Sequence, residues 1–318
     1  MQYTVHHLTR FVYTSPVCEN VTELRMQPLE RPGQQTLRFN VTTSHHARVF
    51  AYRDHYENAV HYFDIPGHHS RLDISVESAV TVLPMAPLPD RLPDETWQQV
   101  DAMAGRWDNM DWLAPSNFAK MSPALAEFAR AIGFKRRGDP LTTLRSLSST
   151  LFAQFAYEPR STRVDSPIDE ALRARAGVCQ DFAHIMTALV RSIGIPCRYV
   201  SGYIAPRDET SIHDRAGSNA THAWVEALLP NLGWLGFDPT NDVLASDRHI
   251  AVAIGRDYSD VPPTRGVFKG SAGSELSVAV GITSSERHLQ RRELSPSVIW
   301  IVAPRPAPYD NDVAQSQQ

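Results

Sequence analysis

The sequence predicts an α+β protein, with a β-sandwich-like N-terminal domain followed by a larger domain in which helices pack on an antiparallel sheet. Up to about residue 82, short runs alternate apolar and polar residues with a period of two, as half-buried strands do. Beyond residue 95 the apolar spacing changes to three and four residues, as in amphipathic helices. A proline-rich stretch separates the two patterns. We therefore expect a β-rich domain, a linker, a second domain and a polar tail over residues 1–84, 85–95, 96–304 and 305–318.

The N-terminal strands follow from the alternating runs, which lie at residues 36–42, 48–53, 60–65 and 72–82. Turn signals at Arg31-Pro32-Gly33 and Pro66-Gly67 separate the runs, so we expect hairpins that close into a small sandwich. Between Leu83 and Pro93 the prolines remove backbone donors and favour extended chain, which predicts the linker.

The second domain begins with helices. Apolar spacing predicts them over residues 123–132 and 140–155, and a third begins near Cys179 and stops at Gly194 and Pro196. Runs rich in aromatic and branched residues then predict strands over residues 197–204, 222–229 and 234–237. Helices are thus followed by one sheet.

Length and composition exclude several classes of protein. The 318 residues are enough for two compact domains, and the hydrophobic and charged fractions, 42% and 21%, are those of soluble globular proteins. A net charge of -4 gives no basic face for nucleic acid. No apolar run reaches the roughly 20 residues that cross a bilayer, and the N-terminus does not resemble a signal peptide. We therefore expect a cytoplasmic protein that binds neither nucleic acid nor membrane; its oligomeric state stays open.

Cys179 stands apart from the other two cysteines because it begins a predicted amphipathic helix. The unpaired N–H groups and the positive end of the helix dipole at this position stabilise a thiolate, which is the nucleophilic form of cysteine. Most free cysteines are small buried packing residues, and Cys18 and Cys197 are expected to be of that kind. Neighbouring Gln180 and Asp181 are expected to cap the helix and not to take part in chemistry.

His222 and Asp238 are the candidate partners of this cysteine. His222 opens one predicted strand and Asp238 closes the next, so a hairpin would place them side by side. A thiol nucleophile needs a base, and the base needs a third group that fixes its tautomer. Taken alone, each residue has a simpler explanation, since histidines are often satisfied core residues and Asp-Pro often opens a turn.

Three separated segments resemble the transglutaminase-like superfamily: GVCQDFAHIMTALVRSIGIPCRYVSGY, THAWVEALLPNLGWLGFDPTN and VAIGRDYSDVPPTRGVFKG. The resemblance extends to bacterial members with a β-rich N-terminal region, whose Asp-x-aromatic-Gly-Asn pattern is similar to Asp54-His55-Tyr56-Glu57-Asn58, with glutamate in place of glycine. It implies a papain-like or transglutaminase-like core, in which a catalytic helix packs on an antiparallel sheet. It also implies Cys179 as nucleophile, His222 as general base and acid, and Asp238 as the residue that orients the imidazole.

The function implied is cysteine-dependent amide-bond chemistry through a thioester, most simply in a peptidase or amidase. The alternatives are an amine-accepting acyltransferase, for protein-glutamine crosslinking or peptide ligation, and a non-catalytic scaffold. The substrate would be a peptide, a protein or an amide-containing small molecule. The second oxyanion donor stays open between Asn117, Tyr157 and nearby polar groups.

No cofactor and no metal are expected. The histidine pairs at 6–7, 45–46 and 68–69 would point to opposite faces of a strand, which makes them poor metal ligands. His184 should point away from Cys179 and serve packing, whereas His213 lies in a polar loop that is either a flap over the cleft or a solvated connection. Trp224 and Trp234 are expected either to wall the site or to pack in the core. The segment 255–263 has no evident chemistry, and we expect it to be a structural loop.

Overall fold

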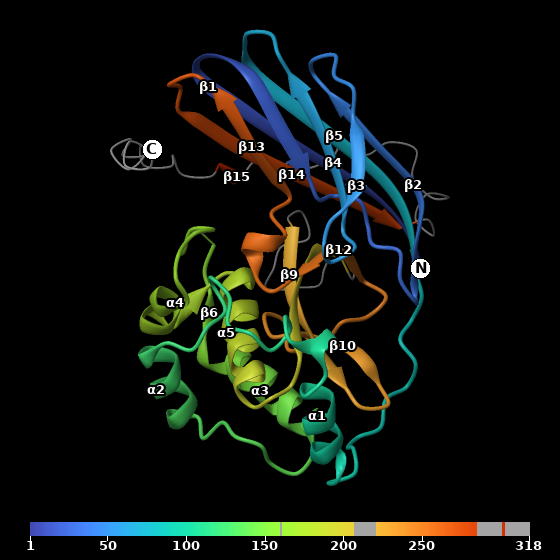
Figure 1. The fold of residues 1–318 in the computed structure, drawn as a ribbon, viewed down its shortest axis with the longest axis vertical. Helices are drawn as coiled ribbons and strands as arrows, with labels where there is room; N and C mark the ends of the chain where they lie inside the picture. Colours follow the sequence, from blue (N-terminus) through green and yellow to red (C-terminus); the bar gives the residue numbers. More distant parts are fainter. Residues whose placement is uncertain (160, 207–220, 285–300, 303–318) are drawn as a thin grey trace.

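The computed structural model describes residues 1–159, 161–206, 221–284 and 301–302, and it confirms the α+β class. A curled antiparallel sheet forms one half of the molecule, and the helices with a second sheet form the other half (Figure 1). Among the described residues, no helix has the length and apolar character needed to cross a membrane. The strands of the first half are β1 (Gln2–Leu24), β2 (Gln34–Thr43), β3 (Phe50–Arg53), β4 (Ala59–Ile65), β5 (His69–Val82), β13 (Thr264–Lys269), β14 (Ser274–Ser284) and β15 (Ile301–Val302).

The second half begins at α1, after a stretch from residue 83 to 95 without helix or strand. Its helices are α1 (Thr96–Ala104), α2 (Pro123–Ala131), α3 (Pro140–Gln154), α4 (Ile168–Ala174) and α5 (Cys179–Ser192), with short 3-10 turns η1 (Trp107–Asn109) and η2 (Tyr258–Asp260). Its strands are β6 (Ala156–Tyr157), β7 (Ala176–Gly177), β8 (Cys197–Ile204), β9 (Thr221–Leu229), β10 (Gly233–Asp238), β11 (Val243–Leu244) and β12 (His249–Gly255). The three predicted helices and three predicted strands of this half are present, within a residue or two of the expected ends.

Strand β1 organises the N-terminal sheet, although the alternating runs did not single it out. Its first part pairs with β5 and β14, and its last part pairs with β4 and β13, with register shifts between Val12 and Val17 and between Cys18 and Val21. The strand therefore passes from one half of a sandwich-like sheet to the other. Its inward side chains contribute to one apolar core, which contains Tyr13, Val17, Leu24, Met26, Phe63, Ile65, Leu72, Ile74 and Val76.

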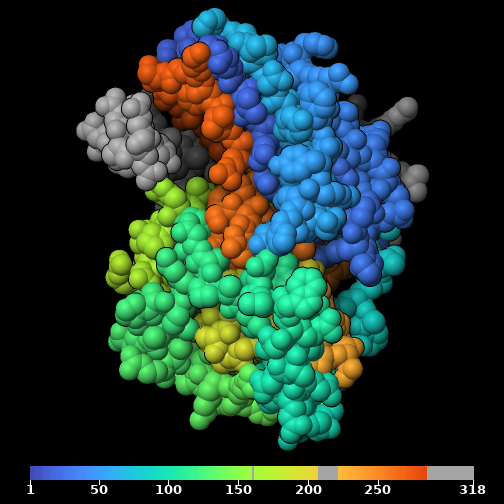
Figure 2. Space-filling view, in the orientation of Figure 1, coloured from blue at the N-terminus to red at the C-terminus, as the bar shows by residue number. Residues whose placement is uncertain are grey.

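The C-terminal strands return to this first sheet, which differs from the expected division of the chain. β13 and β14 both pair with β1, and eleven residue pairs join β1 to β14. In Figures 1 and 2 these late strands, in orange, lie against the blue N-terminal strands. The expected catalytic domain of residues 96–304 therefore includes strands that complete the N-terminal sheet. Such long-range pairing leaves no trace in local sequence periodicity.

The second sheet has the order β11-β10-β9-β8-β12, with every pair antiparallel. Helix α5 packs on β8 and β9, and its residues Phe182, Met186 and Leu189 share a core with Val225 of β9. The opposite side of the sheet meets the N-terminal region, where Trp224 of β9 clusters with Leu29, Val200 and Ala251. The central sheet is thus covered on both faces.

Two side-chain amides attach the N-terminal region to the outer edge of β12. Gln34 donates to the Ala251 carbonyl and accepts from the Ala251 N–H, each at 2.8 Å. Asn58 makes the same pair of bonds with Ile254, each at 2.8 Å. β12 pairs with β8 on its other side, so these bonds satisfy backbone groups that an edge strand would otherwise expose. The position of β12 therefore depends on both halves of the molecule.

The turn that carries Asn58 keeps its shape despite the glutamate at position 57. Asp54 accepts bonds from the N–H groups of Tyr56 and Asn58, each at 3.0 Å. Glu57 adopts a φ of 62°, the left-handed conformation that glycine takes most readily. Glutamate in place of glycine thus introduces local backbone strain at position 57, but the turn is kept.

Candidate functional site

Cys179 is the first residue of α5, in a turn held by Asp181. The Asp181 carboxylate accepts a bond from the Val178 N–H at 2.8 Å and another from the Thr162 hydroxyl at 2.5 Å. Gly177 makes this possible, because a Cβ there would lie 2.9 Å from the Asp181 side chain. The expected capping role of Asp181 matches this geometry. Cys179 itself is half-buried, at the positive end of a 14-residue helix.

His222 and Asp238 lie on the neighbouring strands β9 and β10, and the structure brings their side chains together. His222 Nε2 lies 2.7 Å from Asp238 Oδ2, and both side chains are fully buried. A charged pair at this distance and burial is a strong, charge-assisted hydrogen bond. The expected hairpin therefore delivers the imidazole and the carboxylate to one place.

The thiol of Cys179, at the start of α5, also influences the pKa of this imidazole. Burial alone would lower the pKa of His222, but the Asp238 carboxylate, with a smaller contribution from the nearby Cys179, raises it to about 10. Because Nε2 bonds with Asp238, Nδ1 is the ring nitrogen left for the thiol. The arrangement favours a protonated imidazole beside the sulfur over a wide range of pH.

Asp238 accepts more bonds than the sequence indicated. Its Oδ2 also accepts from Asn241 Nδ2 at 2.7 Å and lies 3.2 Å from His249 Nε2, while Oδ1 accepts from the N–H groups of Thr240 and Asn241 at 3.0 and 3.3 Å. Burial would raise the pKa of this carboxyl, but the two histidines hold it well below its usual range. The carboxylate is therefore ionised and fixed in orientation.

His249, the first residue of β12, is the site residue that sequence reasoning missed. It lies 11 residues after Asp238, and β12 joins the sheet beside β8, on the far side from β10. No local pattern indicates that such a strand returns its first residue to the carboxylate.

Two imidazoles and a carboxylate are also a set that a divalent metal could use, since their ligand atoms lie within 4.8 Å of one another. The hydrogen-bond pattern argues for a different arrangement. His249 Nδ1 accepts from the Ser246 N–H at 3.1 Å, which places the proton of a neutral ring on Nε2, the atom that faces Asp238. A metal would need that nitrogen without its proton, so we assign a hydrogen-bonded cluster here.

Trp224 lines the buried side of the site, whereas Trp234 does not. The Trp224 ring stacks on His222 with centroids 6.0 Å apart and meets His249 edge-on at 5.2 Å. Gly202 leaves room for it, because a Cβ at this position would lie 2.7 Å from the indole and 2.2 Å from the Ile250 carbonyl. Trp234 instead packs on Trp112 and under the Arg198 guanidinium.

Of the two donors considered, Tyr157 is the one that lies close enough to Cys179 to feel its charge. Its strand β6 pairs with β7, placing Tyr157 opposite Gly177, two residues before Cys179. Burial, with the charges of Cys179 and Asp238, raises the pKa of the Tyr157 phenol, so it keeps its proton. Asn117 is exposed, next to Phe118, whose N–H donates to Asp257.

The remaining candidate residues that the structure describes make packing contacts or hydrogen bonds outside the site. His184 accepts from the Tyr258 N–H at 3.1 Å and stacks on Phe118, so it serves packing as expected. In the segment 255–263, the buried Asp257 accepts from Phe118 N–H at 2.7 Å, which ties this loop to the core. Cys18 and Cys197 are free thiols outside the site, and burial raises the pKa of Cys197 to about 12. His213 lies outside the described residues.

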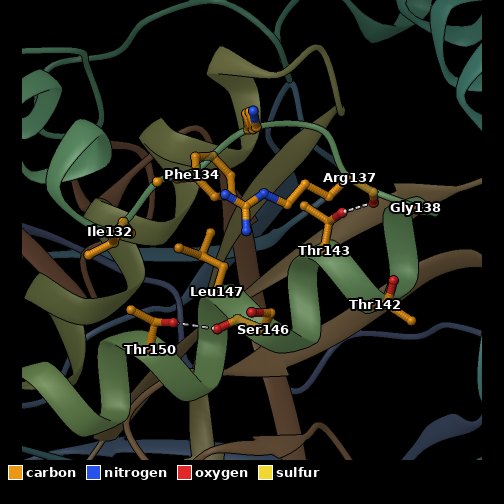
Figure 3. A pocket seen from close by; sticks show the side chains of 11 residues that line it. Ile132, Phe134, Arg137, Gly138, Thr142, Thr143, Ser146, Leu147 and Thr150 are labelled. Atoms are coloured by element: carbon orange, nitrogen blue, oxygen red, sulfur yellow. Dashed lines mark hydrogen bonds between the residues drawn. The ribbon is translucent and has the colours of Figure 1, made fainter.

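A hollow of about 260 Å³ lies elsewhere, between the end of α2 and the first turns of α3 (Figure 3). Its rim carries Lys135 and Arg137 and the hydroxyls of α3. The hydroxyls of Thr143 and Thr150 already donate to backbone carbonyls. None of Cys179, His222 and Asp238 lines this hollow. The candidate site is therefore identified from the arrangement of these three side chains, and the hollow is not part of it.

The chain matches two family models. Residues 125–239 match the transglutaminase-like superfamily, and residues 3–81 match the bacterial transglutaminase-like N-terminal region. The first match includes Cys179, His222 and Asp238, and the second covers most of the N-terminal sheet.

Individual proteins resemble the chain over nearly its whole length or over part of it. An uncharacterized protein of Mycobacterium leprae is 32% identical over 281 residues, which cover 88% of this chain and 97% of that protein. A protein-glutamine gamma-glutamyltransferase of Pseudomonas aeruginosa is 30% identical over 142 residues, which cover 43% of this chain and 20% of the enzyme. The crystal structure of a candidate cysteine protease from Cytophaga hutchinsonii superposes with a TM-score of 0.70 at 18% identity, covering 95% of this chain and 97% of that one. This last likeness confirms the fold.

Proposed function

This chain belongs to the transglutaminase-like superfamily, and from that premise we propose that it is an enzyme that breaks amide bonds through a thioester on Cys179. One observation carries the proposal. A cysteine at a helix N-terminus lies beside an imidazole that is hydrogen-bonded to a buried, ionised carboxylate. These are the nucleophile, the base and the orienting group that thiol catalysis requires.

The proposed reaction begins with the thiolate of Cys179 and the imidazolium of His222. The sulfur adds to the amide carbon, and the carbonyl oxygen becomes an oxyanion. The N–H groups of the first turn of a helix have no partner within the helix, so the Cys179 N–H can donate to this oxyanion. The hydroxyl of Tyr157 is our proposal for the second donor.

Collapse of the oxyanion breaks the C–N bond. The leaving amine takes the proton of His222, and the acyl group stays on sulfur as a thioester. Water then adds to the thioester while neutral His222 accepts its proton, and the C–S bond breaks to return the thiolate and the imidazolium. Asp238 keeps the imidazole in one orientation throughout and stabilises its charged form.

We favour hydrolysis, because an unshielded thioester meets water at high concentration, whereas amine transfer needs an acceptor site that excludes water. The alternative is an amine-accepting acyltransferase, which the similarity to the Pseudomonas aeruginosa enzyme supports. Peptide, protein or amide-containing small-molecule substrates and a cytoplasmic location stay predictions from the sequence.

The test is incubation of the wild type and a Cys179→Ala variant with a glutamine-containing peptide library, with and without a primary amine. Mass spectrometry reads the products. Cleavage or deamidation that disappears in the variant would establish a hydrolase, and incorporation of the amine would establish an acyltransferase. If the wild type gives neither product and Cys179 is alkylated no faster than Cys18, the chain is a scaffold and the proposal fails.

A further inference from the structure

His249 is a buried histidine that the proposed reaction does not use, although it touches the carboxylate at the centre of the site. It is 2% exposed, and its Nε2 lies 3.2 Å from the same Asp238 oxygen that binds His222. Its ring also packs edge-on against Trp224, which stacks on His222. Two histidines therefore share one carboxylate oxygen, and their ring centroids lie 6.1 Å apart.

The hydrogen bonds of His249 define which nitrogen carries its proton. Nδ1 accepts from the Ser246 N–H at 3.1 Å, so a neutral ring holds its proton on Nε2 and donates it to Asp238. Burial lowers the pKa of His249 more than Asp238 raises it, which keeps the ring neutral near pH 7. His249 is therefore a fixed donor to the carboxylate and does not compete with His222 for its charge.

We propose that His249 is a positioning residue that orients Asp238 toward His222. The proposal rests on the function proposed above and assigns a fourth residue to the same site. With Asn241 it gives Oδ2 two donors besides His222, so the carboxylate cannot turn away from the imidazole without losing bonds. A reoriented carboxylate would leave the imidazolium, and with it the thiolate of Cys179, less stabilised.

The fold holds His249 in place from both halves of the molecule. β12 pairs with β8 through His249 and Ile204 at its start, and Gln34 of the N-terminal region binds its outer edge at Ala251, two residues on. One role of the N-terminal sheet in this account is to fix the strand that carries the positioning histidine.

The test uses two variants that separate the two hydrogen bonds of the ring. Gln in His249→Gln places an amide N–H near the position of Nε2 and can still donate to Asp238, but it loses the acceptor for Ser246. Asn in His249→Asn places its amide near Nδ1 and can still accept from Ser246, but it is too short to reach Asp238. The readout is the rate of alkylation of Cys179 by iodoacetamide between about pH 5.5 and pH 10, followed by mass spectrometry of the Cys179 peptide.

We expect His249→Asn to lower the alkylation rate near pH 6 by about tenfold, since a bond to a charged partner is lost, and His249→Gln to stay within about threefold of wild type. The groups that face this cluster are unchanged in both variants: Cys179, His222, Asp238, Tyr157 and Arg248. Equal rates in all three proteins, or equal losses in both variants, would overturn the positioning role. A wild-type Cys179 that reacts no faster than Cys18 would instead overturn the proposed function, so the two failures are distinguishable.

Discussion

Replacing Asp238 by asparagine should remove the charge that holds the imidazole of His222 protonated while keeping the size of the side chain. The carboxylate accepts bonds at both oxygens, so an asparagine must turn an N–H toward at least two other N–H groups. The change therefore removes a charge and disrupts the orientation of the imidazole together. We expect Cys179 to lose most of its thiolate character.

The size of the effect follows from the pKa of His222. Its rise from 6.5 to about 10, against the opposing effect of burial, corresponds to roughly 5 kcal/mol of stabilisation of the imidazolium. This stabilisation is complete below pH 6.5 and is lost as the pH rises through the folded value. Without it, the thiolate form of Cys179 loses its charged partner. A stabilised thiolate is less nucleophilic, so we expect a loss of about 10- to 100-fold in alkylation rate near pH 6.

The pH dependence is the sharper signature. The wild-type rate should be nearly flat from about pH 6 to pH 9, whereas in Asp238→Asn it should rise about tenfold per pH unit until an ordinary thiol is ionised. Cys197 in the same sample reports unfolding, because it is buried in the native protein. A variant that keeps the flat profile and the wild-type rate, with Cys197 still protected, would show that Asp238 does not sustain the thiolate of Cys179.

Three further predictions concern the surroundings of the site. Tyr157→Phe should lower amide turnover by about a hundredfold if its hydroxyl is an oxyanion donor, yet leave the alkylation rate of Cys179 unchanged, because alkylation forms no oxyanion; equal loss in both assays would contradict this. Glu226→Gln should lower the free energy of unfolding in urea by roughly 3–5 kcal/mol, because Glu226 is buried between Arg31 and Arg198. Burial opposes ionisation of Glu226, but the two arginines lower its pKa below 4.5, so this stabilisation is present above that pH and is lost as the pH falls; a variant with an unchanged acid unfolding profile would count against it. A chelator such as EDTA should leave the alkylation rate and the turnover unchanged, whereas loss that returns on adding zinc would show a metal in the histidine–carboxylate cluster.

The local elements of the fold could be predicted because their signals lie within single segments. Pro140 follows Asp139, which caps α3 through the N–H groups of Leu141 and Thr142 at 2.9 and 3.1 Å, and this is a pattern of adjacent residues. The hairpin that joins His222 to Asp238 is likewise short in sequence. The helix of Cys179 likewise followed from its apolar spacing and from the stop at Gly194 and Pro196, without knowledge of the tertiary fold.

The remaining features depend on contacts between distant segments. β13 and β14 pair with β1 across about 250 residues of chain, and nothing in their own sequence indicates this partner. His249 reaches Asp238 only because β12 crosses to the far edge of the sheet, beside β8. The amides of Gln34 and Asn58 that bind this strand come from the N-terminal region. Each of these contacts depends on tertiary packing, and the periodicity of the local sequence does not predict it.

Acylation by 4-nitrophenyl acetate, followed by peptide mass spectrometry after rapid acid quench, tests directly whether Cys179 is the nucleophile. This activated ester needs no knowledge of the natural substrate, and acetyl transfer to sulfur releases nitrophenolate in a visible burst. We expect one acetyl group on Cys179, a burst that matches it in amount, and loss of both in Cys179→Ala and His222→Ala. Acetylation that falls on lysines or on Cys18, with Cys179 unmodified in the folded wild type, would contradict the claim that Cys179 is the nucleophile.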